Sequence, residues 1–290
     1  MTDISNLACV DPAAKIGTGV RIGPFCVVGP DVTIGEGCEL LNHVTIQGVT
    51  RIGAHNIFYP HSVIGVAPQD LKYKGAPTET RIGYGNVFRE NCTVHRGTEL
   101  GGGQTVIGNN NLFMVACHVA HDCTLKDKII VGNESLLGGH VTIEEGVVVE
   151  ALVGVHQFVT LGKYSYIGGT TPVHRDVPPF MKFSGDPNAV RGVNEEGLRR
   201  NNFGEEEVEQ LKLAYRALYR SYTISASLEE LEQQEGLNGH VRYLCEFIRR
   251  SMESRFGRYQ ETLRRDKPQD RRRDIPVEVK TKNRRKEERQ

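Results

Sequence analysis

The segment IGTGVRIGPFCVVGPDVTIGEG, residues 16–37, carries an apolar residue at every sixth position. The same step starts at Val10, runs to Ile64, resumes from Ile82 to Val94, and resumes again from Ile107 to Val173. A second position, two residues before each apolar anchor, holds a small or β-branched side chain. This position includes Ala14, Val20, Cys26, Val32, Cys38, Cys92, Cys117 and Cys123. The sequence therefore offers two inward positions in every six residues.

This period predicts a β-solenoid, because a short strand followed by a turn at each sixth residue closes a triangular coil after three strands. Successive coils of eighteen residues would stack at about 4.8 Å, the usual spacing of paired strands. The large anchors would fill the prism, and the glycine that often follows an anchor would supply backbone freedom at the corner. By resemblance to known hexapeptide proteins, we expect a left-handed parallel β-helix.

Two interruptions and a change of period divide the chain. The β-helix is expected over residues 1–189, with inserted loops at about residues 65–81 and 95–105. A solenoid places its insertions in loops, often on the binding face. Helical periodicity within residues 205–222, 227–234 and 239–256 predicts a small α-helical C-terminal domain over residues 190–263. Ser227 is expected to cap the second of these helices. Residues 264–290 are basic and poor in apolar residues, so we expect a disordered tail.

Composition excludes several classes of function. Lys+Arg and Asp+Glu both total 36 in the 290 residues, so no global field indicates a nucleic-acid partner. The first fifteen residues do not resemble a signal peptide. No stretch approaches the roughly 20 apolar residues of a membrane span, so we expect no stable membrane insertion. Seven cysteines without a CxxC pair indicate a reducing cytoplasm, and five of them fit as small buried side chains.

Histidines recur at close to the length of one coil. His95, His121, His140 and His156 are predicted to form one column beside the two inserted loops, with His118 next to it. Three interpretations follow. The H-x-x-H pair with a distant histidine could bind zinc. His121 could be a general base that Asp122 orients. In the third interpretation the β-helix is only a scaffold, and these histidines have no chemical role.

Seven motifs in order carry a resemblance to a known family: QDLKY, TVHRGTELGGG, HVAHDC, LLGGHVTI, VHQF, DVPPF and GVNEEGLRR. Together with the helical C-terminal part, they resemble the UDP-N-acetylglucosamine O-acyltransferases. The resemblance implies transfer of a 3-hydroxyacyl chain from acyl carrier protein to the 3-OH of UDP-N-acetylglucosamine, the first step of lipid A synthesis. It also implies a cytoplasmic homotrimer with sites between neighbouring prisms, and no metal or other cofactor beyond the phosphopantetheine of the donor.

The same resemblance assigns roles to individual residues. His121 would be the general base, Asp122 would hold it, and the Gly139 N–H would stabilise the oxyanion. Substrate contacts are implied for Gln69, Asp70, Lys72, His95, His118, His140, His156, Gln157, Gly169, Asn194, Glu196 and Arg200. Asn201 departs from the family, which commonly has a second arginine there. Gly169 lies where the family measures acyl length, so we expect a long chain.

Surface arginines of the helical part are candidates for receiving the acidic carrier protein. They are Arg199, Arg216, Arg220, Arg249 and Arg250. Two other enzyme classes stay open at this point: a hexapeptide acyltransferase acting on another sugar nucleotide, and a β-helical zinc hydro-lyase.

Overall fold

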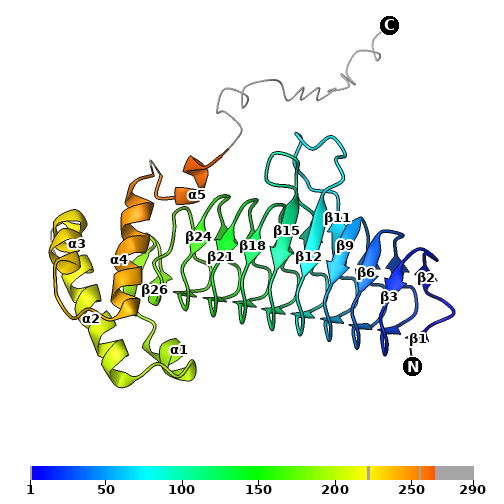
Figure 1. Cartoon of the computed structure of the whole chain (residues 1–290), viewed down its shortest axis with the longest axis horizontal. Coiled ribbons are helices and arrows are strands. Elements are labelled where there is room, and N and C mark those ends of the chain that lie inside the picture. Colours follow the sequence, from blue (N-terminus) through cyan, green and yellow to red (C-terminus); the bar gives the residue numbers. More distant parts are fainter. Residues whose placement is uncertain (1, 221–222, 255, 265–290) are drawn as a thin grey trace, which may run out of the picture.

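A computed structural model, which describes residues 2–220, 223–254 and 256–264, shows the predicted left-handed parallel β-helix followed by helices (Figure 1). The first sheet is β1 (Asp3–Ile4), β4 (Arg21–Ile22), β7 (Glu39–Leu40), β10 (Ile57–Phe58), β13 (Val87–Phe88), β16 (Leu112–Phe113), β19 (Ile130–Val131), β22 (Val148–Val149), β25 (Tyr166–Ile167), β26 (Met181–Ser184) and β27 (Ala189–Val193). The second is β2 (Cys9–Val10), β5 (Val27–Val28), β8 (Thr45–Ile46), β11 (Val63–Val66), β14 (Thr93–His95), β17 (His118–Val119), β20 (Leu136–Leu137) and β23 (Gly154–Val155). The third is β3 (Lys15–Ile16), β6 (Val32–Ile34), β9 (Val49–Ile52), β12 (Glu79–Ile82), β15 (Gln104–Ile107), β18 (Thr124–Leu125), β21 (Thr142–Ile143) and β24 (Thr160–Leu161).

The register confirms the coil length. Asp3 pairs with Arg21, and His118 pairs with Leu136, eighteen residues further along the chain. From Val20 onward both inward positions of each hexad are buried; for example, Val20 is 0% exposed and Ile22 is 2% exposed, whereas Ala14 and Ile16 of the first coil are partly buried. One continuous apolar core therefore runs the length of the prism.

The glycines that follow the anchors serve a different purpose from the one expected. Apart from Gly65 at φ 78°, their φ angles are not in the left-handed region; that conformation falls two residues later, at positions such as Gly19 and Gly37. A Cβ built on Gly35 would instead lie 2.5 Å from the carbonyl carbon of Gly53 in the next coil. The predicted role as a source of backbone freedom is thus wrong, and close approach between coils is the physical reason for glycine there.

A ladder of three asparagines replaces apolar side chains at one inward column. The Asn86 side chain donates to Asn56 Oδ1 and to the Gly108 carbonyl, both at 2.9 Å, and its Oδ1 accepts from the Asn111 N–H at 2.9 Å. Asn56 and Asn86 are 0% exposed. The ladder satisfies polar backbone groups of the coils next to the insertions, which a purely apolar column would leave without side-chain partners.

The two insertions leave the same edge of the solenoid. One joins β11 to β12 and the other joins β14 to β15, so they are shorter than predicted because these strands extend into the expected loops. Figure 1 shows them side by side, and the Lys74 N–H donates to Glu99 Oε1 across them at 3.1 Å. Arg96 also donates to the Tyr73 hydroxyl at 3.1 Å.

The helical part consists of α1 (Glu195–Arg200), α2 (Glu205–Tyr219), α3 (Ile224–Glu232), α4 (Gly239–Met252) and α5 (Tyr259–Thr262). The predicted domain boundary at residues 189 and 190 falls within β27. The three longer helices occur where predicted, but α3 begins at Ile224, so Ser227 lies inside it and is not its cap. The Tyr243 hydroxyl of α4 donates to Glu144 at 2.6 Å and fixes the helices to the end of the solenoid.

No helix within the described residues is long and apolar enough to cross a membrane. The basic tail predicted over residues 264–290 lies outside the described residues except for Arg264.

Candidate active site

His121 and Asp122 form one corner of a coil, between β17 and β18. Asp122 adopts φ 61°, as do the residues at the same corner of the next two coils, His140 at φ 62° and Phe158 at φ 66°. Positive φ is uncommon for residues other than glycine, although Asn, Asp and His adopt it more often than other types. The same backbone turn therefore recurs in three successive coils and places three side chains along one edge.

Asp122 is held by three hydrogen bonds. Its Oδ1 accepts from the Thr98 N–H at 2.8 Å, and its Oδ2 accepts from the Thr98 hydroxyl at 2.6 Å and from His121 Nδ1 at 2.7 Å. The carboxylate side chain is 0% exposed, whereas the His121 side chain is 15% exposed. The bond to Asp122 assigns the ring proton to Nδ1 and leaves Nε2 of His121 as the basic atom.

Gly139 lies directly against the imidazole of His121. A Cβ built on Gly139 would be 2.6 Å from Cε1 and 2.8 Å from Nε2 of that ring. Among the described residues, the Gly139 N–H has no hydrogen-bond acceptor. The His121 imidazole thus lies beside a residue whose backbone N–H is available as a donor, and such donors can stabilise a developing oxyanion.

His95 and His118 form a second pair beside this corner. Their ring centroids are 4.7 Å apart, and His118 Nδ1 lies 2.7 Å from the Thr93 hydroxyl. Burial, together with His118, His121 and Arg96, lowers the pKa of His95 to about 4. Burial and His121 also lower the pKa of His118. Both rings are therefore neutral near pH 7.

The single column predicted for His95, His121, His140 and His156 is wrong. His121 aligns with Gly139 and Gln157, because these residues are eighteen apart, whereas His140 aligns with Asp122. His140 packs edge-on against His121 with centroids 5.2 Å apart, and its Nε2 is 3.9 Å from Asp122 Oδ2. The spacings of nineteen and sixteen residues shift each histidine to a neighbouring position of the same edge.

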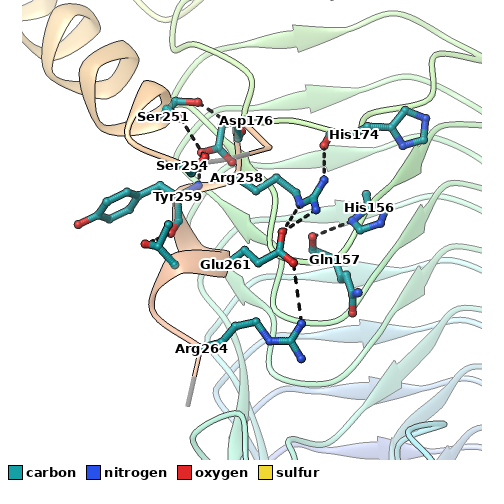
Figure 2. Close-up of polar contacts among 12 residues, drawn as sticks. His156, Gln157, His174, Asp176, Ser251, Ser254, Arg258, Tyr259, Glu261 and Arg264 are labelled. Atoms are coloured by element: carbon teal, nitrogen blue, oxygen red, sulfur yellow. Dashed lines mark hydrogen bonds and ion pairs between the residues drawn. The ribbon is translucent and has the colours of Figure 1, made fainter. Parts of the chain in front are cut away.

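Other predicted contacts extend along this edge in both directions. Asp70 and Lys72 come from the first insertion, where Asp70 Oδ1 accepts the Lys72 N–H at 2.9 Å, and Gln69 there is exposed. His156 and Gln157 lie at the edge near α5, and Gln157 is exposed (Figure 2).

Four predicted contacts lie elsewhere in the chain: Gly169, Asn194, Glu196 and Arg200. Gly169 is exposed at a different corner, between β25 and the bridge at Val173. Asn194 caps α1 by accepting the Gly197 N–H, while Arg200 donates to Glu196 at 3.0 Å. Figure 1 places α1 on the opposite side of the molecule from the insertions. Within one chain these residues are not brought to His121.

The remaining sequence candidates are mostly engaged in local contacts. The Asn201 side chain donates to the Gly197 carbonyl at 2.8 Å, at the end of α1. Arg199 pairs with Glu205, and Arg249 pairs with Glu232.

A metal ion would find three ligand atoms here. His121, Asp122 and His140 offer atoms within 4.8 Å of one another, and they form the one such group in the described residues. This set differs from the H-x-x-H pair considered from the sequence, since it contains His140 and Asp122 in place of His118. Both oxygens of Asp122 already accept hydrogen bonds, so a metal would compete with Thr98 and His121 for them.

Sequence reasoning missed three residues of this edge. Thr98, in the second insertion, supplies two of the hydrogen bonds to Asp122. Phe158 stacks on His140 with centroids 4.3 Å apart, and the Arg264 guanidinium lies 4.5 Å from the Phe158 ring. Of the three, only Phe158 could have been found from the sequence, because it lies one coil length, eighteen residues, after His140.

The chain is similar to known proteins over most of its length. A family model described as "Udp N-acetylglucosamine O-acyltransferase; Domain 2" matches residues 176–257, and one described as "Bacterial transferase hexapeptide (six repeats)" matches residues 13–48. The acyl-[acyl-carrier-protein]–UDP-N-acetylglucosamine O-acyltransferase of Thermodesulfovibrio yellowstonii is 40% identical over 249 residues, which are 86% of this chain and 96% of that protein.

The chain is also similar to solved structures of the same family. The UDP-N-acetylglucosamine acyltransferase of Bacteroides fragilis is 39% identical, with a TM-score of 0.82, and the match covers 85% of this chain and 96% of the other. The enzyme of Francisella novicida is 36% identical, with a TM-score of 0.83, over 89% of this chain and 93% of the other.

Proposed function

The chain belongs to the UDP-N-acetylglucosamine O-acyltransferases, and on that premise we propose that His121, Asp122 and Gly139 transfer a 3-hydroxyacyl group from acyl carrier protein to the sugar 3-OH. This is the first step of lipid A synthesis. The observation that carries the assignment of residues is the buried Asp122 carboxylate bonded to His121 Nδ1 at 2.7 Å, beside Gly139.

The proposed reaction is a direct transfer. His121 Nε2 removes the proton of the 3-OH, and the sugar oxygen attacks the thioester carbonyl carbon. A new C–O bond forms, the C–S bond breaks, and the imidazolium returns its proton to the departing phosphopantetheine sulfur. Asp122 keeps the ring oriented and stabilises its positive charge. No acyl-enzyme and no resident cofactor take part in this scheme.

The carbonyl oxygen becomes negatively charged during the attack, and we assign its stabilisation to the Gly139 N–H. A single oxyanion donor is worth about 3 kcal/mol of barrier where one has been removed. The neutral state of His95 and His118 supports their role as hydrogen-bonding contacts for the substrate rather than as charges. Lys72 is the cation of the first insertion that we assign to the diphosphate.

A homotrimer is the proposed assembly, with each site completed by a neighbouring copy. Two observations support it. Asn194 and Arg200 lie at the two ends of α1, which Figure 1 places on the opposite side from the insertions, and Gly169 lies at a different corner from His121, so a site that uses them needs a second copy. Leu136 and Leu152 are exposed by 53% and 55% on the solenoid surface. Exposed apolar side chains of this kind are typical of subunit contacts. A monomer mass by light scattering would contradict this assembly.

We also propose a cytoplasmic location and a preference for long acyl chains. The seven cysteines are all unpaired, which fits a reducing compartment. Gly169 is exposed and has no side chain, which is what would leave room for a long acyl chain; a methyl group added there would lie 3.3 Å from the Ala151 carbonyl oxygen, a tight contact. Competition between C10 and C14 hydroxyacyl donors tests the second point, and a preference for C10 would contradict it.

The test of the function is acyl transfer from 3-hydroxyacyl carrier protein to UDP-N-acetylglucosamine, with and without EDTA. We expect product in EDTA from the native protein and almost none from a folded His121→Ala variant. Activity that EDTA abolishes would refute the direct mechanism and favour metal chemistry at His121, Asp122 and His140. Turnover with other sugar nucleotides but not with this one would refute the acceptor.

A further inference from the structure

Residues 256–264, here named the C-terminal strap, pack across the last coils of the solenoid and include α5 (Figure 2). The family match ends at residue 257, so most of the strap lies beyond the matched segment. It has no part in the mechanism described above.

The strap is fixed to the solenoid by Asp176. The Asp176 N–H donates to the Gly257 carbonyl at 2.6 Å, and its Oδ2 accepts the Tyr259 N–H at 2.9 Å. Its Oδ1 accepts the Thr160 N–H at 2.7 Å, from the strand β24. Arg258 adds a bond to the His174 carbonyl at 2.9 Å. One oxygen of the Asp176 carboxylate thus binds a coil of the solenoid, and the other binds the strap.

The charged side chains of the strap are nearly covered. Arg258, Glu261 and Arg264 have side chains that are 11%, 14% and 12% exposed. Arg258 donates to Glu261 Oε2 through two nitrogens, at 2.9 and 2.5 Å, whereas Arg264 Nη1 lies 3.9 Å from Glu261 Oε1. The trio carries one more positive than negative charge, and the Arg264 guanidinium supplies that charge at the edge of the solenoid that carries His140 and Phe158.

A continuous series of contacts leads from Arg264 to the base. The guanidinium carbon lies 4.5 Å from the Phe158 ring centre, and Phe158 stacks on His140 with centroids 4.3 Å apart and planes 6° apart. His140 in turn has Nε2 3.9 Å from Asp122 Oδ2. Because the positive φ angles of His140 and Phe158 fix where their side chains leave the backbone, the stacked neighbours decide how the rings are turned.

We propose that Arg264 is a positioning residue for the acyl transfer, acting through Phe158 and His140 on the His121–Asp122 pair. A guanidinium prefers the face of an aromatic ring and packs flat on it, which restricts the Phe158 ring. The restricted ring keeps His140 in its edge-on contact with His121. The inference rests on the proposed function, since the acyl transfer is what the positioning would serve.

The test compares Arg264→Gln, Phe158→Leu and the double variant in the full chain, with Arg21→Gln as control. Arg21 is a surface arginine of the first coils that pairs with Glu39. We expect Arg264→Gln to lower kcat about fivefold to tenfold while KM for UDP-N-acetylglucosamine stays within twofold. Arg264→Lys should recover most of kcat, because an ammonium also binds an aromatic face. Adding Arg264→Gln to Phe158→Leu should change nothing further, because coupled residues are not additive.

An unchanged kcat in Arg264→Gln, a loss confined to KM, or effects that multiply in the double variant would overturn the inference. So would a lower melting temperature with native kcat. A measurement free of activity separates this failure from failure of the proposed function: the His140 imidazole resonance should move in Arg264→Gln and not in Arg21→Gln. If the chemical shift of the His140 imidazole were unchanged in Arg264→Gln, the positioning role would be overturned even if the enzyme used another substrate.

Discussion

Gly139→Ala is the substitution whose effect the structure defines most closely. The added Cβ would lie 2.6 Å from Cε1 and 2.8 Å from Nε2 of His121, and ordinary contact begins at 3.4 Å. The imidazole must therefore retreat by roughly 0.8 Å at Cε1 and 0.6 Å at Nε2, away from the position that Asp122 sets. The substituted residue keeps its backbone N–H, so the proposed oxyanion donor is still present.

The expected result is a kcat reduced roughly 30- to 100-fold, since a misplacement of about 1 Å costs about two orders of magnitude. Thermal stability should change little, because the clash is with the end of a side chain. The assay is steady-state acyl transfer, with Gly239→Ala as control, because a Cβ at Gly239 meets nothing within 4 Å. A kcat within threefold of the native value would refute the reasoning, because it would mean that the ring position is not critical.

Three further outcomes follow from the same contacts. Asp122→Asn should lower kcat by about three orders of magnitude with the fold intact, because an amide cannot accept all three hydrogen bonds and selects the wrong imidazole tautomer; a loss below tenfold in the transfer assay would contradict this. His95 is neutral in the fold and its pKa is lowered to about 4, so its contribution to stability is present above pH 6.5 and is lost as the pH falls toward 4. Urea unfolding should show about 2 kcal/mol less stability at pH 5 than at pH 7.5, and His95→Asn should reduce that difference; an equal difference in the variant would reject the assignment. Asn86→Ala should cost about 2–4 kcal/mol of unfolding free energy, because the Gly108 carbonyl and the Asn111 N–H lose a buried partner; a cost below 1 kcal/mol would show that the ladder is dispensable.

The repeat period predicted the architecture because it is a local property. Each anchor such as Ile22 needs only its own hexad to be recognised, and the solenoid repeats that information in every coil. The adjacency of His121 and Asp122 was likewise visible, since neighbours in a corner remain neighbours in the fold.

The contacts that could not be predicted from the sequence join residues that are far apart along the chain. Thr98 reaches Asp122 from an insertion of irregular length, so no period connects the two residues. Arg264 is more than a hundred residues from Phe158, and α5 has only four residues, too few for a helical pattern. The histidine columns failed for a smaller reason: a spacing of nineteen instead of eighteen moves a side chain to the next position of the corner.

The corner that holds Asp122, His140 and Phe158 has a consequence for how such an enzyme can change. The same backbone position recurs once per coil, and in three successive coils it carries a carboxylate, an imidazole and a phenyl ring. The inward positions keep the fold regardless of which occupant is present. A single substitution can therefore install a new chemical group at a step of about 4.8 Å along this edge without rebuilding the scaffold. The side chain at each repeat of this corner can therefore be exchanged independently of the others. Selection can adjust the chemistry and the substrate length by changing one such position at a time.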